Sequence, residues 1–246
     1  MLLKKIKDKH LLPSAFTAKD FMGKYHKGFK SPPTVIFLFH EKFFYEAVEK
    51  YSASRQSYRG LYKISEKLAL QLSPVGAAAA CSTAEDLFAA DAERIIIFGF
   101  AGAINENLDV GNLVLCDMAL KDEGVSRKYS PEGEDFSFPS ACLKEEIASM
   151  LKNNKISFRH GPTWTTEAPY RETCEEIKLY SRQGVLTVEM EASALFSMAS
   201  YHKKDAAALF TVSDILSGNK KGFGFHFKRL KENYIKTLLL LCEKYK

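Results

Sequence analysis

The sequence lacks the cysteine spacing of disulfide-stapled and zinc-binding proteins. Its five cysteines are odd in number, widely separated and never arranged as Cys-x-x-Cys. A disulfide framework uses an even set of cysteines, and a structural zinc site uses closely spaced pairs of ligands. We therefore expect free thiols, no metal site and a reducing compartment, the cytoplasm.

Long apolar runs are also missing. The longest purely aliphatic run covers residues 238–241, whereas a membrane helix needs roughly 20 apolar residues. The first twelve residues interrupt their short apolar pieces with charge, so we expect no signal peptide there. The sequence thus predicts no membrane association.

A strong excess of one charge is absent too. The net charge is +5, charged residues make up 26% of the chain, and lysines concentrate near the two ends. The basic segments at 4–10 and 220–229 are short and mixed with other residue types, so they favour solvated surfaces or an anionic small ligand. We expect no nucleic-acid partner.

Apolar runs bounded by turn residues alternate with helical patterns along the chain. The expected strands are 34–39, 94–100, 112–120, 185–188 and 206–212. The expected helices are 41–51, 82–92, 139–153, 171–183, 189–203 and 228–245. Strands that are apolar at every position suit a sheet covered on both faces, so this alternation predicts one layered α/β domain over residues 1–246.

Two acids flank Met190 where an apolar strand pattern meets an apolar helical pattern. On a helix, Glu191 shares a face with Leu195 and Met198, so its carboxylate points toward the core. A buried carboxylate is costly unless donors satisfy it. Glu191 is therefore either an acidic helix cap or a rigid acceptor for ligand hydroxyls, and Glu189 is a second acceptor or the cap.

Asp214 follows directly on the apolar strand pattern of residues 206–212. Ligands of open α/β sheets bind at the carboxyl ends of strands, and an aspartate beside apolar walls can hold a proton near neutral pH. The alternative is a turn that Asp214 forms with Ser213. Residues 217–225 come next and are rich in Gly, Ser and Asn, which favours a mobile flap.

A glycine-containing turn surrounds the end of the expected strand at 94–100. Its glycines do not have the Gly-x-Gly-x-x-Gly spacing of a dinucleotide site, and no Lys-Ser/Thr pair marks a P-loop. The turn therefore indicates only a place where backbone can approach a ligand closely.

The loop at 162–173 combines aromatic, hydroxyl and acidic side chains. A flat heterocycle can stack on Trp164 or Tyr170 while Thr166 or Glu167 forms hydrogen bonds with its edge. The alternative is a structural loop with one buried aromatic residue.

These four pieces, in this order, resemble the nucleoside phosphorylase family. This family includes hexameric purine nucleoside phosphorylases, uridine phosphorylases and adenosylhomocysteine/methylthioadenosine nucleosidases. The resemblance runs from about residue 68 to the C-terminus, and its most specific motifs are QGVLTVEMEASALFSMA and FTVSDIL, the second typical of the purine branch. The segments FGFAGAINENLDVGNLVL, ALKDEGVSRKYSP and WTTEAPYRET resemble further parts of the family pattern.

The resemblance implies a fold and a reaction. The fold is a three-layer α/β domain with a mixed central sheet flanked by helices, assembled as a homodimer or homohexamer. The reaction is phosphorolysis of a nucleoside, of the purine class by the FTVSDIL motif, to free base and ribose 1-phosphate. Phosphate is the co-substrate, and no metal or organic cofactor takes part.

The resemblance also implies roles for individual residues. The ribose would bind to Glu189, Met190 and Glu191. The base would bind to Trp164, Thr166, Glu167, Tyr170 and Ser213. Asp214 would be the catalytic acid, because cleavage of the glycosidic bond builds negative charge on the departing base and a proton donor stabilises it.

The expected phosphate site departs from the family pattern. Where the family has a Gly-Asp-Pro-x-Arg loop, this chain has His40 and Lys42, and where the family has an Arg and a Ser or Thr near the glycine turn, it has Ile97 and Phe100. Loss of charged donors weakens an anion site. Hydrolysis by water and nucleoside binding without turnover are therefore the alternatives to phosphorolysis.

Few residues remain for phosphate binding. Within the chain they are Gly76, Gly99 and Phe100, and a neighbouring subunit would add Arg55 or Arg59. In the same way, His10 would reach the sugar of a partner.

Overall fold

A continuous ten-stranded sheet forms the centre of the protein. We describe the chain from a computed structural model, which covers residues 8–217 and 227–246. The strands are β1 (Thr34–Leu38), β2 (Ser54–Arg55), β3 (Leu61–Lys63), β4 (Leu68–Leu72), β5 (Arg94–Ala103), β6 (Leu113–Asp122), β7 (Phe136–Ser137), β8 (Arg159–Thr166), β9 (Thr187–Glu189) and β10 (Asp205–Ile215). Apart from Ser217, the predicted flap at 217–225 lies outside the described residues.

Part of the sheet closes on itself around β5. One edge of β5 pairs with β10, and its other edge pairs first with β1 and then with β9. Because β10 continues through β6 and β8 to β9, these five strands form a closed ring, while β1, β4, β3 and β2 extend outward from β5. Parallel pairs such as β1–β5 and antiparallel pairs such as β5–β9 occur together, which confirms the predicted mixed sheet.

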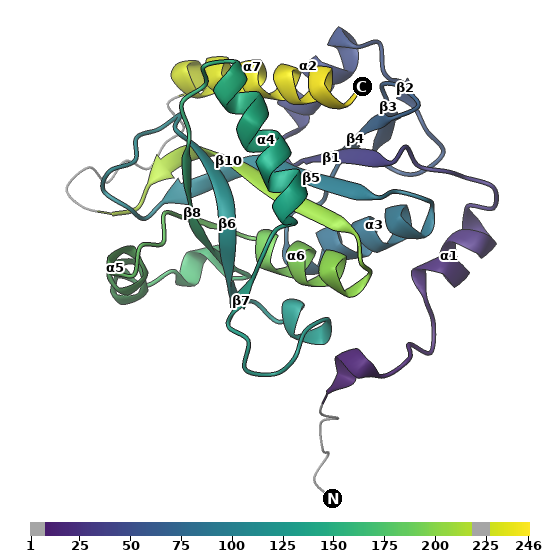
Figure 1. The fold of residues 1–246 in the computed structure, drawn as a ribbon, viewed down its shortest axis with the longest axis horizontal. Helices are drawn as coiled ribbons and strands as arrows, with labels where there is room; N and C mark the ends of the chain where they lie inside the picture. Colours follow the sequence, from purple (N-terminus) through teal and green to yellow (C-terminus); the bar gives the residue numbers. More distant parts are fainter. Residues whose placement is uncertain (1–7, 218–226) are drawn as a thin grey trace, which may run out of the picture.

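Helices cover both faces of the sheet (Figure 1). They are α1 (Ala18–Tyr25), α2 (Glu41–Lys50), α3 (Ala77–Ala89), α4 (Ala141–Asn153), α5 (Cys174–Arg182), α6 (Ala192–Tyr201) and α7 (Phe227–Tyr245), with short 3-10 turns η1 (Lys9–Leu11), η2 (Ser126–Lys128) and η3 (Pro169–Arg171). Ile96 and Phe98 of β5 face the side of α2, α4 and α7, whereas Ile95 and Ile97 face the side of α3 and α6. The three-layer α/β prediction is therefore confirmed.

The alternation of side chains along β5 explains this layering. Successive side chains of a strand point to opposite faces, so a strand that is apolar at every position demands cover on both sides. Residues 95–98 are at most 1% exposed. On the face covered by α7, Tyr234 stacks on Phe98 with 4.3 Å between the ring centroids and donates its hydroxyl to the Phe98 carbonyl at 3.0 Å. Among the described residues, no helix is long and apolar enough to cross a membrane.

Candidate functional site

The start of α6 is capped by Glu189. One carboxylate oxygen of Glu189 accepts the backbone N–H groups of Glu191 and Ala192, each at 2.8 Å. The other oxygen accepts the Thr165 hydroxyl at 2.5 Å. Helix N-termini leave free N–H groups that favour a negative charge, so Glu189 fills the structural role of the cap. Both oxygens of Glu189 are therefore engaged within the fold, and ribose binding by Glu189 remains a prediction.

Glu191 occupies the N-cap position of α6, but its side chain does not cap the helix. Its carboxylate instead accepts the Gly76 N–H at 2.5 Å, and the residue is 6% exposed. Gly76 directly precedes α3 and has φ +101°, a conformation that favours glycine. Glu191 therefore joins the N-terminal ends of two helices, beyond the carboxyl end of β4.

Burial controls the protonation of both acids. It raises the pKa of Glu191 to about 7. Burial, and after it the nearby Glu191 carboxylate, raise the pKa of Glu189 to about 8. Removing a carboxylate from water disfavours its charged form, and two like charges disfavour it further. The site thus holds an acid pair that a ligand with hydroxyl donors would stabilise in its charged form.

A second set of buried groups fixes the first turn of α6. The Ser193 hydroxyl donates to Glu123 at 2.9 Å, and the Ser193 N–H donates to the Thr165 hydroxyl at 3.0 Å. Glu123 also accepts the Ser126 N–H at 3.1 Å and is only 4% exposed. Sequence reasoning assigned no role to Glu123 or Ser193. The DEG segment at the end of β6 was the available signal, because buried acids after a strand need nearby donors.

Asp214 lies near the carboxyl end of β10, next to an irregularity in its pairing with β5. The Ser213 hydroxyl donates to Asp214 Oδ1 at 2.5 Å. Gly102 of β5 lies beside Oδ2, where a Cβ atom would come within 3.5 Å of it. The Ser213 hydroxyl thus orients the Asp214 carboxylate, and the roles of the two residues toward a base remain predictions.

Strand β5 lies between Asp214 and the acid pair formed by Glu189 and Glu191. Gly102 is paired with Asp214 on one side and with Val188 of β9 on the other. With neighbouring strands about 4.8 Å apart, the backbones at Val188 and Asp214 are separated by about 10 Å. Glu189 and Glu191 follow within three residues of Val188. Both acidic motifs thus belong to the same end of β5.

Glu172, just after η3, is a further acid at this end and was not predicted. Burial, and after it the Asp214 carboxylate, raise the pKa of Glu172 to about 7. A neutral carboxyl can donate a hydrogen bond as well as accept one. No feature of the sequence set Glu172 apart, because its burial and its proximity to Asp214 arise only in the folded chain.

The two aromatic residues predicted to stack on a base, Trp164 and Tyr170, lie in opposite environments. Trp164 belongs to β8, is 1% exposed, packs against Tyr180 at 5.0 Å and donates its ring N–H to Asp122 at 3.0 Å. Tyr170, in contrast, is fully exposed. Trp164 is thus covered by the core and Tyr170 is open to solvent, and base stacking on either ring remains a prediction.

Two polar residues of this segment support turns. The Thr166 hydroxyl accepts the Ala168 N–H at 3.3 Å, and the Glu167 carboxylate accepts the Gly124 N–H at 3.2 Å. Both interactions hold the chain near the ends of β6 and β8. Base contacts from Thr166 or Glu167 remain a prediction.

The residues expected at the phosphate have different surroundings. Gly76 already donates its N–H to Glu191. Gly99 lies against Phe39, where an added Cβ would be 3.3 Å from the ring. The Phe100 ring lies 4.7 Å from that of Tyr234 and 5.9 Å from that of His40, so it contributes packing rather than charge.

The candidate residues for a neighbouring subunit lie away from this end of β5. Arg55 lies on the edge strand β2, four strands from β5 or about 19 Å, and both Arg55 and Arg59 are exposed. His10 lies in η1, against the layer formed by α3 and α6. Within one chain none of the three completes the site.

Among the described residues, no group of three or more His, Cys, Asp or Glu side chains is arranged to hold a metal ion. The chemistry that this end of β5 offers is that of carboxyl groups and helix N-termini. It suits a ligand with hydroxyls on one part and a group needing a proton on another.

Known proteins share this architecture. The chain is similar to a guanosine phosphorylase of Halorubrum lacusprofundi, with 28% identity over 150 residues that cover 60% of this chain and 61% of the relative. It is also similar to a DeoD-type purine nucleoside phosphorylase of Streptococcus thermophilus, with 32% identity over 124 residues that cover 50% and 57%. The matched segments thus span less than two thirds of these relatives.

A solved structure matches over more of the chain. The fold superimposes on AMP nucleosidase from Bacteroides thetaiotaomicron with a TM-score of 0.71 and 21% identity, covering 92% of this chain and 95% of the other. The family model described as the phosphorylase superfamily matches residues 36–241. With the buried Glu191 at the start of α6 and Asp214 at the end of β10, this match establishes that the chain belongs to the phosphorylase superfamily.

Proposed function

We propose that this protein cleaves the N-glycosidic bond of a purine nucleoside, with phosphate as the nucleophile, to give the free base and ribose 1-phosphate. This makes it a pentosyltransferase that needs phosphate as co-substrate and no metal or organic cofactor. It works as a homodimer or homohexamer, in which Arg55, Arg59 and His10 act from a neighbouring copy. The names of the two phosphorylase relatives support both the purine and the phosphate.

One observation carries the proposal: Glu191 is buried without serving as the helix cap. Glu189 already caps α6, so the fold gains no cap from a second carboxylate nearby. Burial of Glu191 to 6% exposure raises its pKa, so the charged form of this carboxylate lowers the stability of the folded protein. An acceptor held in this way suits two adjacent ribose hydroxyls, because hydrogen bonds to a charged acceptor are the stronger ones.

The proposed roles follow the charges that develop during cleavage. As the glycosidic bond breaks, the sugar gains positive charge and the base gains negative charge. Glu191 and Met190 hold the ribose in place, and Asp214 gives its Oδ2 proton to the departing purine. The Ser213 hydroxyl on Oδ1 fixes the orientation of that acid.

The N-terminus of α3 supports phosphate as the nucleophile. Its first turn contains no acidic residue, and Gly76 at the N-cap has no side chain to cap it. The Gly76 N–H is bonded to Glu191, and the backbone N–H groups that follow it can bind an anion. Hydrolysis is the second candidate, and a specific observation favours it. Ile97 is fully buried and Phe100 packs against Tyr234, at positions where the family resemblance calls for polar phosphate ligands. The AMP nucleosidase neighbour is a named example of a nucleosidase with this fold.

A phosphate-dependence assay tests the proposed function. Purified protein is incubated with inosine, guanosine, adenosine and uridine, with and without phosphate, and base release is followed by chromatography. We expect release from a purine nucleoside only when phosphate is present. Equal release in both conditions would establish hydrolysis instead, and binding without release would contradict turnover altogether.

Replacing Asp214 by Asn removes the proposed proton donor while keeping its shape. We expect kcat for the preferred purine nucleoside to fall by about 10²- to 10⁴-fold with little change in KM, as for loss of a general acid. The matched control is Asp91→Asn, at an exposed surface position paired with Lys30. An Asp214→Asn enzyme with unchanged kcat would rule out this acid.

Replacing Glu191 by Gln should stabilise the free protein at high pH and abolish activity. The folded pKa of about 7 lies above the ordinary value of 4.5, so the stability linked to this proton is present below pH 4.5 and lost as pH rises through 7. Glutamine does not ionise and avoids that loss. We expect thermal unfolding at pH 8 to show a gain of roughly 1–3 kcal/mol over wild type, and a smaller difference at pH 5.

The control for that comparison is Glu106→Gln, at an exposed turn position. It should leave both stability and activity unchanged at either pH. A Glu191→Gln protein whose stability relative to wild type is the same at pH 5 and pH 8 would contradict the assigned burial cost.

A further inference from the structure

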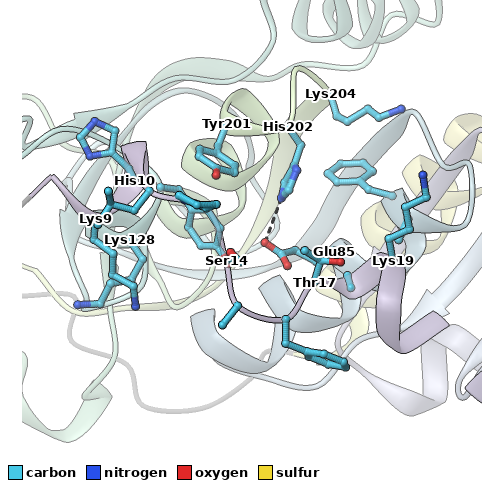
Figure 2. A pocket seen from close by; sticks show the side chains of 18 residues that line it. Lys9, His10, Ser14, Thr17, Lys19, Glu85, Lys128, Tyr201, His202 and Lys204 are labelled. Atoms are coloured by element: carbon cyan, nitrogen blue, oxygen red, sulfur yellow. Dashed lines mark hydrogen bonds and ion pairs between the residues drawn. The ribbon is translucent and has the colours of Figure 1, made fainter. Parts of the chain in front are cut away.

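A cavity lies between residues 9–19 and the C-terminal parts of α3 and α6, away from the acid pair at the start of α6. Its volume is about 930 Å³, within the range of small-molecule sites. The chain segment from η1 to the start of α1 forms one wall, and α3, η2 and the end of α6 form the other (Figure 2). None of the residues placed at the nucleoside site within this chain lines it.

The floor of this cavity is a hydrogen-bonded cluster of Glu85, His202 and Tyr129. Glu85 of α3 lies 3.0 Å from His202 Nε2 at the end of α6. The His202 contact is the largest cause that lowers the pKa of Glu85, and a hydrogen bond with Tyr129 lowers it as well. The one carboxylate that lines the cavity is therefore already engaged with two neighbours.

Lysines surround this floor. Figure 2 shows Lys9 and Lys128 on one side of the Glu85–His202 pair, and Lys19 and Lys204 on the other. Lys204 is paired with Glu93 at 2.6 Å. Lys9, Lys19 and Lys128 form no ion pair with any residue in the described part of the chain. Cations that line one cleft without counter-charges add their potentials and attract a multiply charged anion.

Aromatic rings provide the remaining surface. Tyr201 is 42% exposed and lies edge-on to His202, with 5.0 Å between the ring centroids. Tyr129 contacts Tyr201 at 5.7 Å, and Phe88 of α3 completes the wall. A flat ring can stack on an exposed aromatic side chain, and such contacts are favourable beyond their buried area. The cavity thus combines a ring surface with a separate cluster of ammonium groups.

Helix geometry separates this cavity from the nucleoside site. Glu85 comes nine residues after Gly76 along α3, and His202 comes eleven residues after Glu191 along α6. At about 1.5 Å per residue these spans are roughly 14 and 16 Å. One small ligand cannot contact both ends, so the cavity is a distinct site.

We propose that this cavity binds a nucleoside diphosphate or a closely related aromatic polyphosphate, with the phosphates on Lys9 and Lys128 and the ring on Tyr201. Two phosphate groups offer one partner to each of these two ammonium groups, whereas a single carboxylate would leave one of them unpaired. The site lies beyond the proposed catalytic function and does not depend on it.

Calorimetric titration of the full chain with ADP and with pyrophosphate, at an ionic strength of about 50 mM, tests this assignment. We expect ADP to bind more tightly than pyrophosphate. The Lys9→Ala/Lys128→Ala double variant should raise the Kd for ADP by about tenfold or more, which is the loss of roughly 1.4 kcal/mol. Tyr201→Ala should weaken ADP binding but leave pyrophosphate binding unchanged.

Two controls separate this site from others. Lys144→Ala/Lys152→Ala makes the same charge change on α4, on the opposite face of the sheet, and should leave the ADP Kd within about twofold of wild type. Glu191→Gln, at the nucleoside site, should also leave it unchanged. Absence of ADP binding, equal weakening in both lysine double variants, loss of binding in Glu191→Gln, or equal affinity for ADP and pyrophosphate would each overturn the proposal.

Discussion

The hydrogen bond between the Gly76 N–H and the Glu191 carboxylate is the constraint on which the rest of the site depends. It ties the start of α3 to the start of α6 at the carboxyl end of the sheet, over a span of 115 residues in sequence. Because a buried carboxylate needs donors, the backbone around Gly76 has to approach Glu191 closely, and its positive φ suits glycine. The positions of the groups that we propose to contact the sugar depend on this hydrogen bond.

The two glutamates on either side of Met190 have different roles. Glu189 supports the fold, and Glu191 is the acid that we propose for ligand binding. Glu189 satisfies the free N–H groups of α6 and is held by Thr165, so it stabilises the helix. Glu191 lies in the same buried region with fewer hydrogen-bond partners, and burial raises the pKa of both acids. A side chain that lowers stability but is held in a rigid position is typical of a ligand-binding site. The Glu123–Ser193 contact adds rigidity to the same turn.

Sequence patterns predicted the layered fold and the two acidic motifs, because both depend on local features. Apolar runs at β1, β5 and β10 and the long periodic pattern of α7 were sufficient for the layers. The start of α6 was placed three residues early, because Glu189 ends a strand and caps the helix instead of joining it.

β8 was missed because Gly161 and Pro162 interrupt its pattern. Gly161 is required by a distant contact, since a Cβ there would lie 2.2 Å from Leu186. The burial of Trp164 was not predictable for the same reason: it depends on Tyr180 of α5, which no local pattern reveals.

The central claim, that Glu191 accepts the ribose hydroxyls, is tested most directly by a double-mutant cycle on binding. Affinities of inosine and 2′,3′-dideoxyinosine are measured for two proteins, Asp214→Asn and Asp214→Asn/Glu191→Gln, so that turnover does not intervene. We predict that the first protein prefers inosine by about tenfold or more and that the second loses this preference, as expected for hydrogen bonds to a charged acceptor. An undiminished preference for inosine in the second protein would contradict the account.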